Sequence, residues 1–339
     1  MVRILLFGTG SVGTVYAMLL SKAGAQVTCV CRSNYETAVS NGFVVRSTIF
    51  GEEHFRPTVV RSVEEAVDNL TADSPFDFIV VCTKAITSHG DHSATDMIHL
   101  AVTKAHTSIV IIQNGLGVER VYRTAFPNNT IISGVTYLPT SHIGAGIVLH
   151  TETQKLHLGP YPAHTAATAE QKRTRAFADL IIAAGGEATV HSDVQIERWK
   201  KLIGNATWNP ICALSRCRDL QFLQSSPKLA YDFVISSMRE VVAVAQAIGY
   251  GDFIGESDVQ QQIQRSKARQ WPGVEPSMLA DMRTGRTMEV EAVIGEVVKI
   301  AKSRRVEVPR LETLYLLLHC SDYISVAVSE SSAAGKKGL

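Results

Sequence analysis

The stretch VRILLFGTGSVG, residues 2–13, decides the fold of this chain. Val2–Phe7 is a short apolar run, typical of a strand that is buried on both faces of a parallel sheet. Gly13–Ala23 then repeats apolar residues at helical spacing, which predicts an amphipathic helix. The glycines at the junction match the pattern GxGxxG. The stretch therefore predicts a strand, a tight glycine turn and a helix, the context in which this pattern binds phosphate groups.

Each glycine in the turn has its own physical role. Gly8 permits the tight turn, Gly10 lets the backbone approach a pyrophosphate, and Gly13 lets the helix pack closely on the strand. The helix N-terminus supplies N–H donors and a positive dipole end. A purely structural turn is the alternative, and the flanking strand and helix favour a dinucleotide site over it. The residues predicted to bind the cofactor here are Gly8, Thr9, Gly10, Ser11, Val12 and Gly13.

The end of the second predicted strand, Gln26–Cys31, bears on the choice between NAD and NADP. An NAD site usually places Asp or Glu there, to bind the ribose hydroxyls. This strand is followed instead by Arg32, Ser33 and Asn34. The guanidinium of Arg32 can pair with a 2′-phosphate, and Ser33 and Asn34 can add hydrogen-bond donors. We therefore predict NADP(H) as the cofactor, the alternative being that Arg32 is a solvated surface residue.

Further strands and helices alternate through the first half of the chain. Phe76–Cys82 and Ser108–Gln113 are typical of buried parallel strands, and Ile131–Leu158 predicts antiparallel strands that finish the sheet. A helix near Ala167–Ala184 and a short strand ending at His191 complete this half. The pattern predicts an α/β Rossmann domain, with a doubly wound and mostly parallel sheet, over residues 1–192.

The second half of the chain is almost wholly helical in pattern. Long periodic segments predict helices over Gln195–Leu214, Lys228–Ile248, Arg286–Ser303 and Arg310–Ile324. We expect an all-α domain over residues 193–328, which carries the substrate-binding and catalytic residues. The small and polar residues 329–339 predict a disordered C-terminal tail.

Composition excludes several classes of function. Of the 339 residues, 33 are basic and 32 acidic without a long basic run, so neither nucleic acid nor a membrane is an expected partner. No signal pattern or apolar run of about 18 residues is present, so we expect a cytoplasmic protein. The sequence does not fix the oligomeric state, and a monomer or a homodimer is expected. The six cysteines form no CxxC pair and no zinc-type spacing with histidine. His89 and His92 are close in sequence but lack further ligands, and no metal site is predicted.

Two later strand ends carry polar residues. Lys84 follows the strand Phe76–Cys82, and Asn114 with Gly115 follows the strand Ser108–Gln113. Both should lie at the carboxyl edge of the sheet, where doubly wound folds bind ligands. A solvated lysine and a simple turn are the alternatives. Their position favours a ligand-binding role for both.

The segment RWKKLIGNATWNP, residues 198–210, is the most informative in the second half. Lys201, Asn205 and Asn209 are spaced by four residues, so on a helix they form one polar stripe. A solvent-facing stripe is the simplest explanation, but asparagine weakens helix interiors by competing for backbone hydrogen bonds. The flanking tryptophans and aliphatic residues leave little exposed surface. The stripe is therefore predicted to face a polar cleft.

A second segment, PSMLADMRTGRTMEVE from residue 276 to 291, contains Ser277 and Glu289. Taken alone, Ser277 is typical of a helix cap. Glu289 alone is typical of an acid at a helix start, where it interacts favourably with the helix dipole. These residues acquire a functional interpretation only together with the other motifs.

With these motifs in place, the sequence resembles the ketopantoate reductase (2-dehydropantoate 2-reductase) family over nearly the whole chain, from residue 8 to about residue 315. The most diagnostic part is the run W-x-K-L-x-x-N-x-x-x-N-P at Trp199–Pro210. The other matching positions are the glycine turn, Arg32, Lys84, Asn114-Gly115, Ser277–Asp281, Glu289 and the closing segment Val308–Tyr315.

The resemblance implies NADPH-dependent reduction of 2-dehydropantoate, a small 2-oxo acid, to (R)-pantoate in the route to pantothenate and coenzyme A. It implies that Lys201 is the general acid and that Glu289 is the carboxylate that anchors the substrate. Lys84 corresponds to the family lysine near cofactor and substrate, and Asn114 is also expected beside the cofactor. The polar residues implied to contact the substrate are Asn114, Asn205, Asn209 and Ser277.

These residue types suit the reduction of a ketone. Hydride addition develops negative charge on the ketone oxygen, which a lysine ammonium can stabilise and then protonate. Asparagine and serine can bind a substrate carboxylate, and glutamate can accept a hydrogen bond from a substrate hydroxyl. Since the helical domain supplies the acid and the Rossmann domain the hydride, the substrate is expected between the two domains, whose closure could expel water.

One position departs from the family pattern, because Asp219 stands where the family often has asparagine. A negative charge beside a substrate carboxylate is unfavourable, so either Asp219 points away or the substrate differs. A reductase of another bulky 2-oxo acid is therefore an alternative. A catalytically silent NADP(H) sensor or scaffold is another, and the retention of Lys201 and its polar partners argues against it.

Overall fold

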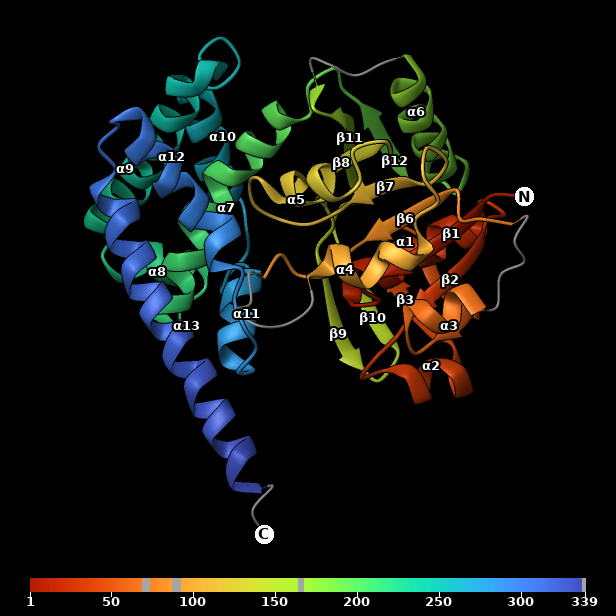
Figure 1. The fold of residues 1–339 in the computed structure, drawn as a ribbon. Helices are drawn as coiled ribbons and strands as arrows, with labels where there is room; N and C mark the ends of the chain where they lie inside the picture. The colour runs from red at the N-terminus through yellow and green to blue at the C-terminus, as the bar shows by residue number, and fades with distance from the viewer. Residues whose placement is uncertain (69–73, 87–92, 164–167, 337–339) are drawn as a thin grey trace. The chain divides into compact units, whose positions relative to one another are not determined.

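The structure is a computed structural model that describes residues 1–68, 74–86, 93–163 and 168–336, with side chains to Ile324 (Figure 1). The chain divides into two compact units. The first unit takes most of the chain up to Val194, and the second begins at Gln195. Ala85 and the segment Asn114–Gly117 group with the second unit, although they lie in the first half of the sequence. The sequence-based division after residue 192 thus misses these two insertions.

The first unit is built on a sheet of eight strands in the described part of the chain. Its neighbouring strands are all parallel except β11 and β8, which are antiparallel. In spatial order the strands are β12 (Glu187–Val190), β11 (Lys155–Tyr161), β8 (Ile131–Tyr137), β7 (Ser108–Ile111), β6 (Phe78–Val81), β1 (Arg3–Phe7), β2 (Gln26–Val30) and β5 (Thr58–Val60). The predicted doubly wound, mostly parallel sheet is confirmed.

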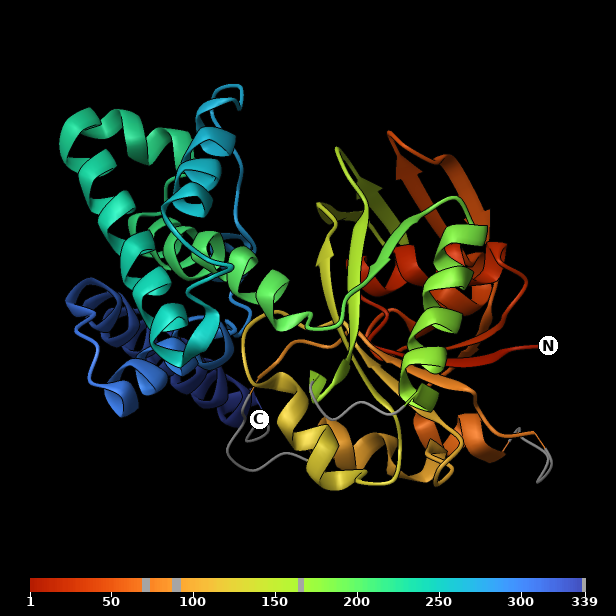
Figure 2. The same cartoon turned by 90° about the horizontal axis from the view of Figure 1, so that it is seen from above.

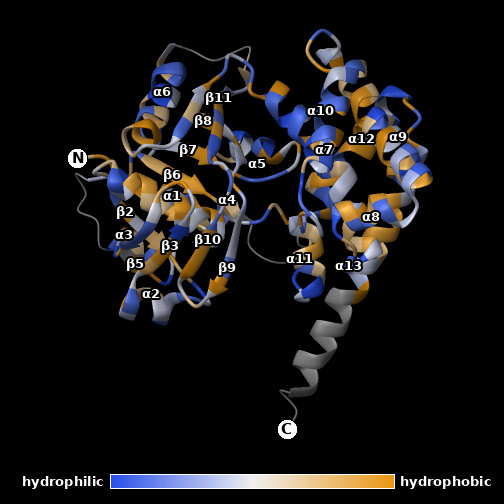
Figure 3. Ribbon diagram, turned by 180° about the vertical axis from the view of Figure 1, so that it is seen from behind, coloured by the Kyte–Doolittle hydropathy of each residue, from blue (hydrophilic) through white to orange (hydrophobic). Residues whose placement is uncertain are grey.

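Helices cover both faces of this sheet, so its central strands β6 and β7 are buried at every residue and mostly apolar (Figure 3). One face packs against α1 (Ser11–Lys22) and α6 (Thr168–Ala183), where Tyr16 and Phe177 are fully buried. On the opposite face lie α4 (Ala94–Ile98) and α5 (Val118–Ala125) (Figure 2). The other described helices of this unit are α2 (Tyr35–Asn41), α3 (Val63–Asp68) and η1 (His99–Ala101).

A second sheet of four strands packs over α1 and was not foreseen. Its order is β4 (Gly51–Phe55), β3 (Phe43–Ser47), β10 (Ile147–His150) and β9 (Thr140–Gly144). The expectation that the strands of Ile131–Leu158 all finish the main sheet is therefore wrong for β9 and β10. Val148 of β10 and Val45 of β3 are fully buried, so this small sheet gains its stability by closing the core beside α1.

The second unit is helical, and α7 is its central helix, packed against α9, α11 and α13. Its elements are α7 (Gln195–Ser215), α8 (Asp219–Ser225), α9 (Pro227–Ala245), η3 (Gln246–Tyr250), α10 (Glu256–Lys267), α11 (Ser277–Arg283), η4 (Glu291–Gly295), α12 (Glu296–Arg304) and α13 (Pro309–Lys336). The predicted all-α second domain is confirmed. None of the described helices is long and apolar enough to cross a membrane.

Two details of the second unit differ from the prediction. The helix expected from Arg286 begins later, because residues 286–289 are not helical and the first turn, η4, is π-helical. The last helix, α13, continues to Lys336, past residue 329 where a disordered tail is predicted. The segment after residue 329 lacks proline and contains alanines, which permit a helix. Residues 337–339 of the predicted tail lie outside the described residues.

Candidate active site

The glycine turn after β1 has the geometry that its sequence predicts. Gly8 has a φ of +103°, and a Cβ added to it would lie 2.5 Å from the backbone nitrogen of Thr83. A Cβ on Gly13 would overlap the carbonyl oxygen of Gly8. A Cβ on Gly10 would meet no atom within 4 Å. Gly8 and Gly13 are therefore required by packing, whereas Gly10 borders open space that a pyrophosphate could approach.

The non-glycine residues of the turn fix it to the sheet and open the helix. The Thr9 hydroxyl donates to the carbonyl of Val30, 2.9 Å away, and Thr9 is buried. Ser11 is the first residue of α1, and the half-buried Val12 packs against the core. The turn is thus anchored to β2 by a side chain, while the first N–H groups of α1 have no partner inside the helix.

Arg32 is exposed at the carboxyl end of β2, where the sequence places it. Asn34, considered earlier as a phosphate donor, has another contact, since its Nδ2 donates to the Thr9 carbonyl at 3.1 Å. A second arginine, Arg61, follows β5 at the same edge of the sheet. Its guanidinium lies 3.9 Å from the centre of the Tyr35 ring and pairs with Glu36. Arg61 is thus engaged by neighbouring side chains, whereas Arg32 is exposed.

A hydrogen-bonded chain that sequence reasoning missed braces the ends of β6 and β7. The side-chain amide of Gln113 donates to the carbonyl of Thr83 at 3.0 Å, and the Tyr122 hydroxyl donates to Gln113 Oε1 at 3.3 Å. Thr83 in turn lies against Gly8. Lys84 comes next in the chain and is half-buried. Gln113, Tyr122 and Thr83 therefore brace the loop after β6, in which Lys84 lies.

In the second unit, three of the predicted site residues are joined by hydrogen bonds. Lys201 Nζ donates to Asn114 Oδ1 at 2.7 Å, and Asn114 Nδ2 donates to Glu289 Oε2 at 3.4 Å. The other oxygen of Glu289 accepts from the backbone N–H of Ala85 at 2.9 Å. We call Lys201, Asn114 and Glu289 the lysine–amide–carboxylate group. It assembles a cation, an amide and an anion from positions up to 175 residues apart in sequence.

The segment that carries Asn114 is held tightly within this unit. Gly115 has a φ of +93°, and a Cβ there would overlap the carbonyl of Ala292. Arg198 Nη1 donates to the Gly115 carbonyl at 2.9 Å, and Leu116 N–H donates to the Ala292 carbonyl at 2.8 Å. The Asn-Gly pair gave a signal for the turn, but no sequence pattern pointed to Arg198 or to the N–H of Ala85.

The surroundings of Lys201 make its ammonium a better acid. Burial and the neighbouring Arg198 guanidinium lower the pKa of Lys201 to about 8, while Glu289 acts in the opposite direction. Burial disfavours a charged amine, and a second cation nearby does the same. A lysine in this position can release its proton near neutral pH far more readily than an exposed lysine.

The polar stripe of α7 does not face open solvent. Asn205, one turn beyond Lys201, is half-buried, and Asn209, two turns beyond, is 5% exposed. Pro210 lies inside the helix and lacks an N–H, so the carbonyl of Ala206 loses its usual helical partner. Within the described residues, no hydrogen bond joins Asn205 or Asn209 to the lysine–amide–carboxylate group.

Ser277 is the first residue of α11 and is exposed. The side chain does not cap the helix, whose N-terminal flanking residue is Pro276. Its hydroxyl also forms no hydrogen bond with the lysine–amide–carboxylate group among the described residues. The structure therefore does not bring Ser277 together with Lys201 in the way that it does Asn114 and Glu289.

Asp219, the departure from the family pattern, is fully buried and has partners of its own. Its carboxylate pairs with Arg269 and accepts 2.8 Å hydrogen bonds from the backbone N–H groups of Leu220 and Val274. Gly273 must be glycine here, because a Cβ would overlap Asp219 Oδ1. The negative charge of Asp219 is thus compensated locally and connects α8 to the loop before α11.

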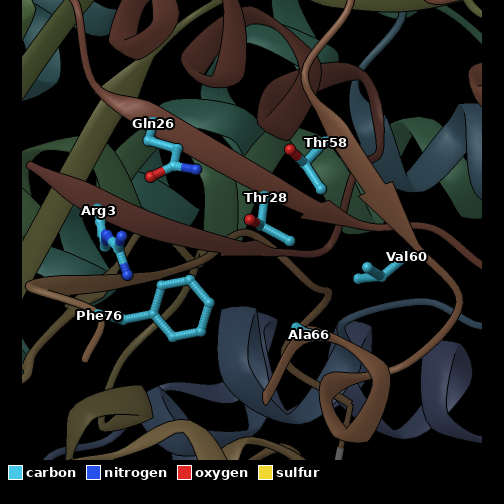
Figure 4. Close-up of a pocket in the computed structure, with 7 residues that line it drawn as sticks. All are labelled: Arg3, Gln26, Thr28, Thr58, Val60, Ala66 and Phe76. Atoms are coloured by element: carbon cyan, nitrogen blue, oxygen red, sulfur yellow. The ribbon is translucent and has the colours of Figure 1, made fainter. Parts of the chain in front are cut away.

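Two other parts of the chain were considered as sites, a possible metal site and a pocket in the first unit. His89 and His92 lie outside the described residues, and the described residues contain no group of three or more histidine, cysteine or acidic side chains able to hold a metal. A pocket in the first unit is drawn in Figure 4. It is lined by Arg3, Gln26, Thr28, Thr58, Val60, Ala66 and Phe76. Three of these begin strands, so it lies toward the amino edge of the sheet, opposite the glycine turn.

The fold and the site define the class of protein first. A glycine turn opening a doubly wound sheet, with a helical unit that carries a half-buried lysine, is the arrangement of an oxidoreductase that uses a nicotinamide dinucleotide. Residues 4–163 match the family model described as "Ketopantoate reductase PanE/ApbA", and residues 193–321 match its C-terminal model. The chain belongs to the ketopantoate reductase family.

The similarity of this chain to known proteins covers almost its full length. An uncharacterized protein of Saccharomyces cerevisiae is 29% identical, over 94% of this chain and 93% of its own. The crystal structure of 2-dehydropantoate 2-reductase from Methylococcus capsulatus is 31% identical with a TM-score of 0.81, over 96% of this chain and 98% of its own. A ternary structure of D-mandelate dehydrogenase with NADH and anilino(oxo)acetate shares the fold, at 18% identity and a TM-score of 0.78, over 95% and 99% of the two chains.

Proposed function

We propose that this protein reduces 2-dehydropantoate to (R)-pantoate with NADPH, a step toward pantothenate and coenzyme A. One observation carries the proposal. The lysine–amide–carboxylate group is hydrogen-bonded together inside a chain that belongs to the ketopantoate reductase family. Its residue types match the charges that the reduction of a 2-oxo acid creates and consumes.

Lys201 acts as the general acid in this proposal. Negative charge develops on the ketone oxygen during hydride addition, and the Lys201 ammonium stabilises it and then donates a proton. The ammonium has three N–H donors, and Asn114 Oδ1 accepts one of them at 2.7 Å, which fixes the direction of the side chain. The low pKa of Lys201, about 8, reduces the cost of proton transfer near neutral pH.

Glu289 anchors a hydroxyl of the substrate. Its carboxylate is 8% exposed and is oriented by the N–H of Ala85 and the amide of Asn114. An ionised carboxylate has about four lone-pair sites, so it can accept a hydrogen bond from a substrate hydroxyl as well as from protein donors. 2-Dehydropantoate carries such a hydroxyl at carbon 4, which distinguishes it from simple 2-oxo acids.

The substrate carboxylate requires donors without a further negative charge. Asn205, Asn209 and Ser277 supply amide and hydroxyl donors and are proposed to bind it. Asp219 no longer favours a different substrate, because its charge is already compensated by Arg269 and by backbone N–H groups.

The cofactor is held by the first unit. The residues that fit its pyrophosphate are Gly8, Thr9, Gly10, Ser11, Val12 and Gly13, because the turn leaves space at Gly10 beside the N-terminus of α1. Arg32, exposed after β2, is proposed to pair with a 2′-phosphate, and Lys84, in the loop after β6, to contact the cofactor. When bound, NADPH supplies the hydride.

The test is NADPH oxidation, followed at 340 nm, with 2-dehydropantoate and with an analogue that lacks the 4-hydroxyl. Fast turnover of 2-dehydropantoate alone supports both the substrate and the role of Glu289. Turnover of other 2-oxo acids instead keeps the chemistry and rejects the substrate. Tight NADPH binding without turnover of any 2-oxo acid would show a cofactor-binding protein that has lost catalysis.

A further inference from the structure

The turn between Glu289 and α12 is π-helical. Its hydrogen-bond pattern differs from that of an α-helix and leaves one carbonyl to bind the segment that carries Asn114. The N–H of Glu296 donates to the carbonyl of Glu291, five residues back. An α-helix would direct it to the carbonyl of Ala292. The Ala292 carbonyl accepts instead from the N–H of Leu116 at 2.8 Å. Single π-helical turns within α-helices occur frequently at functional sites.

This turn positions Asn114 through its neighbour in sequence. Gly115 lies so close to Ala292 that any Cβ would overlap the Ala292 carbonyl. The backbone on either side of Gly115 therefore follows the position of the π-helical turn. Glu289 is tied to the same turn, because its carbonyl accepts from the N–H of Val293 at 3.1 Å. The positions of Asn114 and Glu289, the other two members of the lysine–amide–carboxylate group, thus depend on the position of this turn.

The side chain of Glu291 fixes the turn to the two helices that follow it. One carboxylate oxygen accepts from the Tyr315 hydroxyl on α13 and the other from Lys299 Nζ on α12, each at 2.7 Å. His319 Nδ1 lies 3.5 Å from the first oxygen. Gly295 leaves room for the carboxylate, since a Cβ there would lie 2.7 Å from Glu291 Oε2. Burial raises the pKa of Glu291, but the hydrogen bonds from Lys299 and Tyr315 outweigh it and lower the pKa.

We propose that Glu291 is a positioning residue, which ties the π-helical turn to α12 and α13 and thereby holds Asn114 and Glu289 around Lys201. Its partners are Tyr315, Lys299 and His319, and none of them belongs to the lysine–amide–carboxylate group. The inference rests on the proposed function, because it assigns Glu291 an effect on the reaction through that group. It predicts that loosening this tie changes the chemistry at Lys201 from a distance.

Two variants test the tie by its effect on turnover. Glu291→Ala removes both contacts, and Tyr315→Phe removes only one hydroxyl and keeps the ring beside Gly295. We expect kcat with 2-dehydropantoate to fall by about tenfold in Glu291→Ala and by less in Tyr315→Phe, with KM for NADPH unchanged. The matched control is Glu307→Gln, an exposed glutamate in the loop after α12, which should leave both constants unchanged.

A second readout does not require turnover. The Glu289 carboxylate raises the pKa of Lys201, against burial and Arg198, so a displaced Glu289 should let that pKa fall below about 8. The pH dependence of Lys201 acetylation by acetic anhydride, read by mass spectrometry, reports this pKa. We expect the midpoint to lie at lower pH in both variants than in the wild type and Glu307→Gln.

An unchanged acetylation midpoint in folded Glu291→Ala overturns the positioning role. Should Glu291→Ala fail to fold, Tyr315→Phe decides the same question, because the loss of one hydroxyl leaves the packing of its ring intact. A wild type that turns over no 2-oxo acid rejects the proposed function, and the acetylation experiment still decides whether Glu291 positions the lysine–amide–carboxylate group.

Discussion

An ordinary lysine holds its proton too tightly to be an efficient acid near neutral pH, and the surroundings of Lys201 reduce that affinity. Burial and Arg198 lower its pKa to about 8, while Glu289 prevents a larger shift. Catalytic acids work best when their pKa lies near the working pH. The combination of a second cation and an anion around one lysine is therefore consistent with a tuned acid.

Replacing this lysine should affect chemistry more than binding. We expect Lys201→Ala to lower kcat on the order of 10²- to 10⁴-fold, because proton donation and charge stabilisation are both lost. NADPH affinity, measured by fluorescence titration, should stay nearly constant. Lys200→Ala is the matched control, since Lys200 is the adjacent lysine and its ammonium pairs with Glu197. A kcat that survives in Lys201→Ala would remove the acid role from this residue.

The rate of reduction should depend on pH through the same group. Lys201 is protonated below its pKa of about 8 and loses its proton as the pH rises through that value. Since the general acid must carry the proton, kcat/KM for reduction should be high below about pH 8 and decline above it. Steady-state rates between pH 6 and about 10 measure this profile. A profile that is flat across this range contradicts the assignment.

Cofactor choice is also a question at the scale of one residue. Arg32 is exposed at the end of β2, and its removal should cost the charge-assisted contact with a 2′-phosphate. We expect Arg32→Ala to weaken NADPH binding by about tenfold to a hundredfold and NADH binding much less. Dissociation constants for both cofactors provide the comparison. Equal weakening of the two would show that Arg32 does not read the phosphate.

At the scale of elements, the turn between β1 and α1 contains one glycine that packing requires, Gly13, and one that only cofactor binding is expected to require, Gly10. Gly13→Ala places a methyl group on the carbonyl oxygen of Gly8, so we expect it to destabilise the fold by about 1–3 kcal/mol. Gly10→Ala meets no neighbour, so it should keep the melting temperature and weaken NADPH binding. Thermal unfolding and cofactor titration of both variants check this contrast, and equal stability losses would contradict it.

Elements with local signals were predictable from the sequence, and elements defined by distant partners were not. The strand β1 is a short apolar run, the helices α1 and α7 have clear helical periodicity, and the structure contains all three. The small second sheet was missed for two reasons. β10 pairs with β3, about a hundred residues earlier in the chain, and β4 is mostly polar, so it lacks the apolar pattern that predicts a strand. The π-helical turn before α12 was missed because its residues have ordinary helical periodicity.

The candidate site shows the same limit. The family resemblance supplied Lys201, Asn114 and Glu289, and the structure joins them by hydrogen bonds, while their catalytic roles stay predictions. The N–H of Ala85 could not be predicted, since a backbone donor has no signature in the identity of its residue. Asp219 could not be interpreted either, because its partner Arg269 lies 50 residues away.

At the scale of the whole molecule, the two compact units do not coincide with two halves of the sequence. Ala85 and Asn114–Gly117 belong to the helical unit, although strands of the first unit flank them on both sides. The lysine–amide–carboxylate group therefore needs three separate parts of the chain. The helical segment that begins at Gln195 contains only Lys201 and Glu289 from that group.

A fragment comprising residues 195–336 should for this reason be less stable than the same residues in the full chain. It would leave Lys201 without Asn114, Glu289 without the Ala85 N–H, and the Ala292 carbonyl without Leu116. Buried polar groups that lose their partners cost about 1–3 kcal/mol each. We expect the fragment to unfold at a lower temperature than the full chain, as measured by circular dichroism. A melting temperature equal to that of the full chain would show that these inserted segments add little to stability.

The distance in sequence between Ala85 and Glu289 also sets an order of events during synthesis. A chain leaves the ribosome from its N-terminus, and its early segments fold first. Ala85 and Asn114 emerge long before Glu289, which lies 204 residues after Ala85. Neither residue can form its hydrogen bond with Glu289 until the chain has been made as far as Glu289. The glycine turn after β1 can consequently form early, whereas the lysine–amide–carboxylate group can assemble only when most of the chain is present.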